Sequence, residues 1–149
     1  MYKEKSMADR AEELGRRRSR MFPMLAIILL TQQASYLNDT HGSRPVDHFK
    51  VGAWIVLSLV LLVALYTGGS WIRSGPMRAL LNDENTRANR ATALGDGFLA
   101  AILTAIACYF INQFEPVRGD EVAHLVVTIG IVIAMIRFGM LEKRAHADG

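Results

Sequence analysis

The chain has 149 residues, of which 51% are apolar and 21% are charged, and its net charge is +3. These averages lie close to those of soluble domains, which are about 45–50% apolar and about 25% charged. The charged residues, however, gather in a few patches separated by long stretches that are nearly free of charge. That distribution argues against a soluble globular domain, a disordered chain and a nucleic-acid-binding protein, and it predicts an integral membrane protein.

Residues 1–20 form a charged tail that contains seven of the 17 basic residues. Glu12 and Glu13 precede Arg16 at spacings that allow ion pairs along a helix, so we expect a helix from about Ala8 to Arg18. The basic run that follows also suits the anionic headgroups of a membrane surface.

Residues 21–38 are the first of four predicted membrane spans, because the stretch carries no charge. Its second half is polar and includes Gln32 and Gln33, whose amides favour hydrogen bonds between helices, with a substrate or quinone contact as the alternative. A cleaved signal peptide is a second interpretation of this segment. Gln32 occupies the −3 position of the candidate cleavage site, where a small residue is preferred, so a retained span is expected.

The segment from Asp39 to Val51 is predicted to be an outer loop with a turn at Gly42 and Pro45. It offers possible metal ligands, but their spacing matches no known ligand pattern and no metal site is expected. These residues are Asp39, His41, Asp47 and His48.

Residues 51–72 are the second predicted span, rich in Leu, Val and Ile. Residues 51–66 contain one aliphatic hydroxyl, that of Ser58, and lack the polar stripe of a helix in a soluble bundle. Trp54 and Trp71 are spaced so that one lies near each membrane interface. Gly75 and Pro76 are expected to end the helix.

The third predicted helix begins at the acidic cap of residues 82–84 and continues to Phe114, with its span over residues 92–114. Small residues recur on it every four positions, at Ala93, Gly97, Ala101 and Ala105. Such a face lets helix backbones approach closely, either within the chain or between two copies of it. Asp96 lies beside this face, and either a structural ion pair or a proton- or cation-linked role would explain an acid there.

Residues 122–141 are the fourth predicted span, followed by a short tail at 143–149, so that the membrane domain covers residues 21–142. The span carries His124 near its outer end, where a lone histidine is expected to be solvated or capped. A candidate intramembrane polar site therefore comprises Gln32, Gln33, Asp96 and His124.

The positions of the basic residues predict the orientation, because cytoplasmic loops are enriched in Lys and Arg. Fourteen of the 17 lie in the two terminal segments and the central loop, and three lie in the other two loops. The expected fold is all-α: a polytopic bundle of four up-and-down transmembrane helices, with both termini cytoplasmic, in a bacterial inner membrane.

No catalytic or cofactor-binding motif is present. Cys108 is the only cysteine, which excludes thiol exchange through a cysteine pair. Only His124 lies within a span, so paired haem ligands are not expected. The P-loop, HExxH and GxSxG motifs are absent. The chain is therefore expected to be no enzyme and to hold no cofactor.

The stretch LLNDENTRANRATALGDGF, from Leu80 to Phe98, resembles the acidic-then-basic lead-in of small uncharacterised bacterial multi-pass membrane proteins. In those proteins it precedes a spanning helix, and the resemblance implies no activity. The favoured function is a non-enzymatic accessory, scaffold or regulatory subunit that acts through helix association with a membrane partner or with further copies of the chain. The alternative is a small transporter or ion-coupled carrier that uses Asp96 and Gln32/Gln33.

Overall fold

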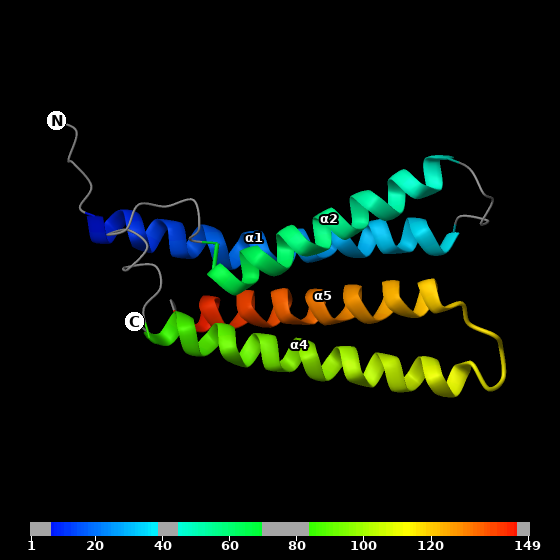
Figure 1. The fold of residues 1–149 in the computed structure, drawn as a ribbon. Helices are drawn as coiled ribbons and strands as arrows, with labels where there is room; N and C mark the ends of the chain where they lie inside the picture. Colours follow the sequence, from blue (N-terminus) through cyan, green and yellow to red (C-terminus); the bar gives the residue numbers. More distant parts are fainter. Residues whose placement is uncertain (1–6, 39–44, 70–83, 146–149) are drawn as a thin grey trace.

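The computed structural model describes residues 7–38, 45–69 and 84–145, and within these ranges the chain is all-helical. Its four helices are α1 (Met7–Asn38), α2 (Pro45–Thr67), α4 (Glu84–Ile111) and α5 (Gly119–Ala145) (Figure 1). Three segments are long and apolar enough to cross a membrane, namely Phe49–Thr67, Glu84–Ile111 and Gly119–Ala145. The all-helical class is confirmed, and these three helices indicate a membrane protein; α1 is not among them.

Helix α1 is one continuous helix of 32 residues that joins the predicted tail helix to the first predicted span. Pro23 lies inside it, and a proline has no N–H for the carbonyl four residues earlier, that of Ser19. Gly139 of α5 lies against this point, because a Cβ added there would be 2.7 Å from Pro23 Cγ and 2.9 Å from the Ser19 oxygen. The two backbones therefore approach closely where the hydrogen-bond ladder of α1 is interrupted.

Both ends of α2 differ from the prediction. Pro45 is the first helical residue rather than part of a turn, which suits its fixed φ and missing N–H. The helix ends at Thr67, before the predicted end at Ile72, because Gly68 and Gly69 adopt left-handed φ angles of 64° and 70°. Gly69 N–H donates to the Ala64 carbonyl at 2.7 Å and Gly68 N–H to the Leu65 carbonyl at 3.1 Å, which is the Schellman arrangement. Trp71, Gly75 and Pro76 lie outside the described residues.

Helix α5 is the centre of the bundle and contacts each of the other three helices, lying between α4 and the pair α1 and α2 (Figure 1). It approaches α4 closely at Gly97, where an added Cβ would be 2.6 Å from both Ala134 Cβ and the Gly130 carbonyl oxygen. At Gly130, in turn, an added Cβ would be 3.1 Å from Ala101 Cβ. The small-residue face of α4 thus packs within the chain, against small residues of α5.

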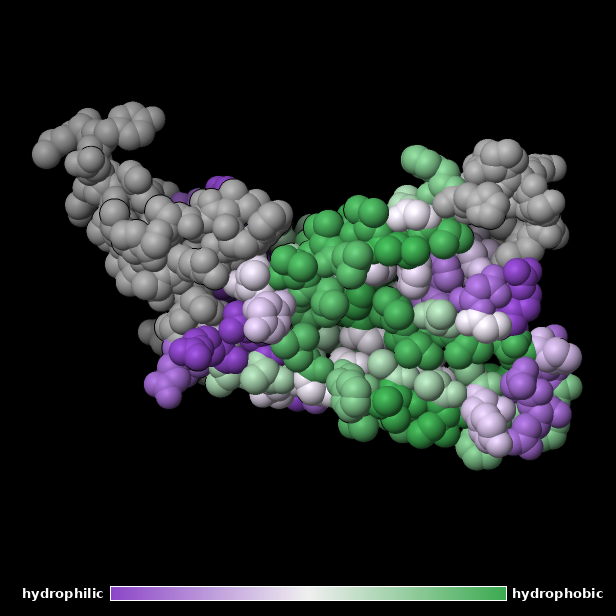
Figure 2. Space-filling model, viewed as in Figure 1, coloured by the Kyte–Doolittle hydropathy of each residue, from purple (hydrophilic) through white to green (hydrophobic). Residues whose placement is uncertain are grey.

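Much of the remaining apolar surface of the bundle is exposed. Figure 2 shows a belt of apolar side chains across the middle of one face, with hydrophilic residues towards both ends. On α2 only one stripe is buried, formed by Trp54, Ser58, Leu61 and Leu65. An exposed apolar belt of this kind is what a lipid-facing surface requires.

Candidate functional site

Polar side chains gather at the two ends of the bundle. We call the set formed by Gln33, Tyr36, Trp54, His124 and Thr128 the histidine cluster. We call the set formed by Arg18, Gly68, Thr86, Asn89 and Glu142 the arginine cluster.

His124 is the centre of the histidine cluster. Its ring lies between two aromatic rings, with centroid distances of 3.9 Å to Tyr36 of α1 and 3.8 Å to Trp54 of α2. His124 is only 4% exposed. The expectation that this histidine is solvated at the interface is therefore wrong, because two aromatic side chains from other helices cover both faces of its ring.

A hydrogen-bond chain crosses three helices one turn away from His124. Trp54 Nε1 donates to Thr128 Oγ1 at 3.2 Å, and Thr128 Oγ1 donates to Gln33 Oε1 at 3.1 Å. Two buried atoms of the cluster, Gln33 Nε2 and His124 Nδ1, have no hydrogen-bond partner among the described residues. Buried polar groups are rarely left in this state, which makes the cluster the first candidate for a functional role.

The histidine cluster reaches the surface through Tyr36, whose hydroxyl donates to Asp120 Oδ2 at 3.1 Å. Asp120 also pairs with Arg118 at 3.0 Å. Both residues of this ion pair are well exposed, so the pair contributes little to stability on its own. The Tyr36–Asp120 hydrogen bond joins the end of α1 to the first turn of α5.

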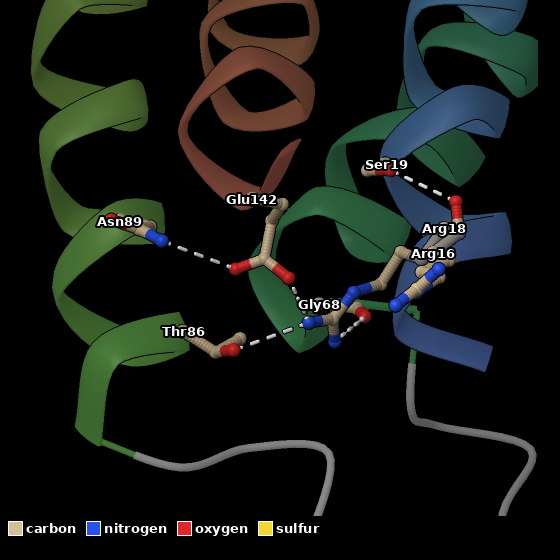
Figure 3. A network of polar contacts seen from close by, with 7 residues as sticks. All are labelled: Arg16, Arg18, Ser19, Gly68, Thr86, Asn89 and Glu142. Carbon is tan, nitrogen blue, oxygen red and sulfur yellow. Dashed lines mark hydrogen bonds and ion pairs between the residues drawn. The ribbon is translucent and has the colours of Figure 1, made fainter. Parts of the chain in front are cut away.

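The arginine cluster lies at the opposite end of the bundle, where Arg18 of α1 forms a buried ion pair with Glu142 of α5 (Figure 3). Their side chains are 11% and 2% exposed. Arg18 also donates to the Gly68 carbonyl at 3.0 Å and to Thr86 Oγ1 at 3.2 Å, while Asn89 Nδ2 donates to Glu142 Oε1 at 3.3 Å. One ion pair thereby ties α1 and α5 to the residue after α2 and to the first turns of α4.

Aromatic side chains line the inner side of the arginine cluster. The Arg18 guanidinium carbon lies 5.5 Å from the centroid of the Phe138 ring, and Phe22 meets that ring edge-on with the centroids 5.0 Å apart. A buried ion pair is favourable only when its remaining hydrogen bonds are made and its surroundings are well packed. The hydrogen bonds to Gly68, Thr86 and Asn89 meet most of the first condition, although Arg18 Nε makes no hydrogen bond within the described residues, and the two rings meet the second.

The structure divides the predicted polar site. Gln33 and His124 belong to the histidine cluster, whereas Gln32 is half-buried and belongs to neither cluster. Asp96 lies elsewhere, 2.7 Å from Arg137 Nε in an ion pair whose two side chains are about 40% exposed. Arg137 lies nine residues along α5 from Thr128, which corresponds to roughly 13 Å of helix rise.

No local sequence pattern indicates the arginine cluster. Arg18 is one of seven basic residues in the first 20, and Glu142 follows the apolar run of α5 without any motif. Trp54 matched the pattern of aromatic residues at membrane interfaces. Trp54 is buried against His124 instead, and only the fold brings α1 and α2 to the same histidine.

Neither cluster offers an obvious metal site or nucleophile. No three His, Cys, Asp or Glu side chains gather as metal ligands in the part of the chain that the structure describes. Of the outer-loop residues considered as ligands, Asp39 and His41 lie outside the described residues, and Asp47 and His48 lie in the first turn of α2. Cys108 is buried on α4 and unpaired.

No protein-family model, curated protein or solved structure matches this chain.

Proposed function

We propose that this chain is a four-span protein of the bacterial inner membrane that acts as a non-enzymatic accessory or regulatory subunit. It does so through helix association with a membrane-protein partner or a second copy of itself. The proposal has three parts, namely a fourth span, an orientation and an association surface.

The fourth span in this proposal is the second half of α1. Its contacts with α5 extend from the Arg18–Glu142 ion pair at one end to the Tyr36–Asp120 hydrogen bond at the other. The 18 residues from Arg18 to Tyr36 correspond to about 27 Å of helix, close to the roughly 30 Å of a hydrocarbon core. Exposed apolar side chains on the outer side of this stretch support lipid contact, and they include Met21, Met24, Ile27 and Ile28.

The orientation in this proposal follows from the basic residues at the end of the bundle that holds the arginine cluster. Arg16, Arg17 and Arg20 of α1 and Lys143 and Arg144 of α5 are exposed there. The positive-inside rule assigns this end to the cytoplasm. A reporter fused after Gly149 is expected to be active if it works in the cytoplasm and inactive if it works only outside; the reverse pattern would overturn the orientation.

The proposed association surface is supported by two exposed glycines, Gly52 on α2 and Gly95 on α4. A Cβ added to either would meet nothing within 4 Å. Glycine lowers helix stability and offers little apolar area to lipid, so a lipid-facing glycine favours a site where another helix approaches. Exposed alanines beside them, Ala53 and Ala91, keep the local surface shallow.

The carrier alternative has less support. It required Asp96 and the glutamines to act together, whereas Asp96 pairs with Arg137 and Gln33 bonds to Thr128 on a different part of α5. No observation in the described helices favours coupled transport over association.

The test compares two glycines that are two residues apart on α4. Gly95→Leu is expected to keep the thermal stability of the purified protein and to weaken its association, measured by cross-linking in native membranes and by co-purification in mild detergent. Gly52→Leu should act in the same way. Gly97→Leu is the contrasting variant: it should lower the stability, because its side chain meets Ala134 and Gly130. Unchanged association in both Gly95→Leu and Gly52→Leu would overturn the proposed surface.

A further inference from the structure

We propose that a groove between the end of α2 and the start of α4 binds the headgroup of an anionic phospholipid. The groove has a volume of about 480 Å³, with Tyr66 on its α2 side and Arg87, Arg90, Ala91 and Leu94 on its α4 side. This inference goes beyond the proposed association, because it concerns a lipid-binding site rather than a surface for another helix.

The charges of the groove favour an anion. Arg87 and Arg90 are three residues apart, so they lie on neighbouring positions of one helix face. Among the described residues that line the groove, Arg87 and Arg90 are basic and Glu84 is acidic, so this part of the lining is net positive. A guanidinium group presents paired N–H donors that match the oxygens of a phosphate.

Arg90 also connects the two sides of the groove. Its guanidinium carbon lies 6.0 Å from the centroid of the Tyr66 ring. Tyr66 is 70% exposed, near the end of α2. Tyrosine is enriched at membrane interfaces, where its ring lies beside the headgroups. The pair therefore holds a cationic group at the level where a phospholipid carries its phosphate.

The position of the groove along α4, close to the expected membrane surface, favours a lipid over a soluble anion. Helix α4 has 28 residues, about 42 Å of helix, and so exceeds a hydrocarbon core of roughly 30 Å. Its polar first turns, which carry Arg87 and Arg90, extend beyond the apolar part that starts at Ala93. Ala91 and Leu94 line the side of the groove nearer that apolar part. A headgroup bound by the arginines would leave its acyl chains against the exposed apolar surface below.

The experiment measures lipid retention by native mass spectrometry of the full chain in mild detergent. Dioleoylphosphatidylglycerol or dioleoylphosphatidylcholine is added in equal amounts. The wild-type chain is expected to retain the anionic lipid and not the zwitterionic one. Arg87→Gln with Arg90→Gln should weaken retention by roughly 30-fold, given the usual contribution of each cation at a membrane surface. Arg20→Gln with Arg144→Gln is the matched control, because it removes two exposed charges at the same end and should retain the lipid.

Two further measurements distinguish a specific lipid-binding site from general electrostatic attraction between anionic lipid and basic residues. Ala91→Phe fills the groove without changing its charge, and it should also abolish retention, while thermal unfolding checks that each variant remains folded. Inorganic phosphate at the same concentration should not displace the lipid. Three results would each overturn the lipid site. They are an equal loss of bound lipid in the Arg20→Gln with Arg144→Gln control, full lipid retention in Ala91→Phe, and displacement of the lipid by phosphate. Ala91 also borders the proposed association surface, so the two proposals are distinguished by the Arg87→Gln with Arg90→Gln variant, which should lose the lipid and keep the association, and by Gly95→Leu, which should keep the lipid.

Discussion

The two ends of the bundle are held together by different chemistry. At the end with the arginine cluster, a buried ion pair joins Arg18 to Glu142 and bonds to Gly68, Thr86 and Asn89. At the other end, His124 is stacked between Tyr36 and Trp54, and two buried atoms of the cluster have no partner in the described residues. The first end depends on an ion pair and its hydrogen bonds, whereas the second depends mainly on ring contacts.

This difference predicts how each end responds to substitution. A buried charge that loses its partner is strongly destabilising, because the remaining charge has neither solvent nor counter-ion. A stacked neutral ring loses only its contact area and ring geometry when it is replaced. Substitutions in the arginine cluster should therefore have the larger effects.

The largest expected effect is that of Glu142→Ala, which leaves Arg18 buried without its carboxylate. We expect a loss of about 3–5 kcal/mol in the free energy of unfolding. The measurement is thermal or denaturant unfolding in a fixed detergent.

Two controls sharpen this prediction. Glu13→Ala removes the exposed partner of Arg17, a pair at 2.9 Å, and should change stability by less than about 1 kcal/mol. The double variant Arg18→Met with Glu142→Leu should recover much of the loss, because it removes both charges together. An equally small effect of Glu142→Ala and Glu13→Ala would show that the Arg18–Glu142 pair is hydrated.

The sequence predicts those structural features that depend on local residue patterns. Apolar runs without charge indicated the helical class and the spanning length of α2, α4 and α5. The four-residue spacing around Gly97 indicated a packing face, since such a face needs only helical periodicity. The Gly68–Gly69 pair is also visible in the sequence, but the prediction that Gly75 and Pro76 end the helix placed its end too late.

Features that depend on long-range pairing could not be predicted in this way. Arg18 and Glu142 are 124 residues apart, and nothing local distinguishes Arg18 from Arg16 or Arg17. His124 likewise has aromatic neighbours from two other helices. Which helix faces meet depends on the packing of the whole bundle, and α5 contacts all three of the others.

The second prediction concerns His124 and tests whether ring contacts hold the histidine cluster. His124→Phe keeps a flat ring between Tyr36 and Trp54 and removes the buried Nδ1, so stability should stay equal or rise by about 1 kcal/mol. His124→Ala removes both stacked pairs and should cost about 1–3 kcal/mol. Thermal unfolding, with Trp54 fluorescence as a local signal, distinguishes the two variants. A clear loss in His124→Phe would show that the imidazole makes a hydrogen bond that the aromatic ring cannot replace.

The smallest expected effect is at the Asp96–Arg137 pair, which contrasts an exposed ion pair with the buried one. Both side chains are about 40% exposed, so most of their attraction is offset by water or headgroups. Asp96→Asn should change the free energy of unfolding by less than about 1 kcal/mol, and Arg137→Gln should behave alike. Asp96 also lies beside Gly97, where α4 approaches α5 closely, so a larger loss in Asp96→Asn alone would mean that its charge orients this contact. Equal, small losses in both variants would instead show that the Asp96–Arg137 pair contributes little to the contact between α4 and α5, in contrast to the buried Arg18–Glu142 pair between α1 and α5.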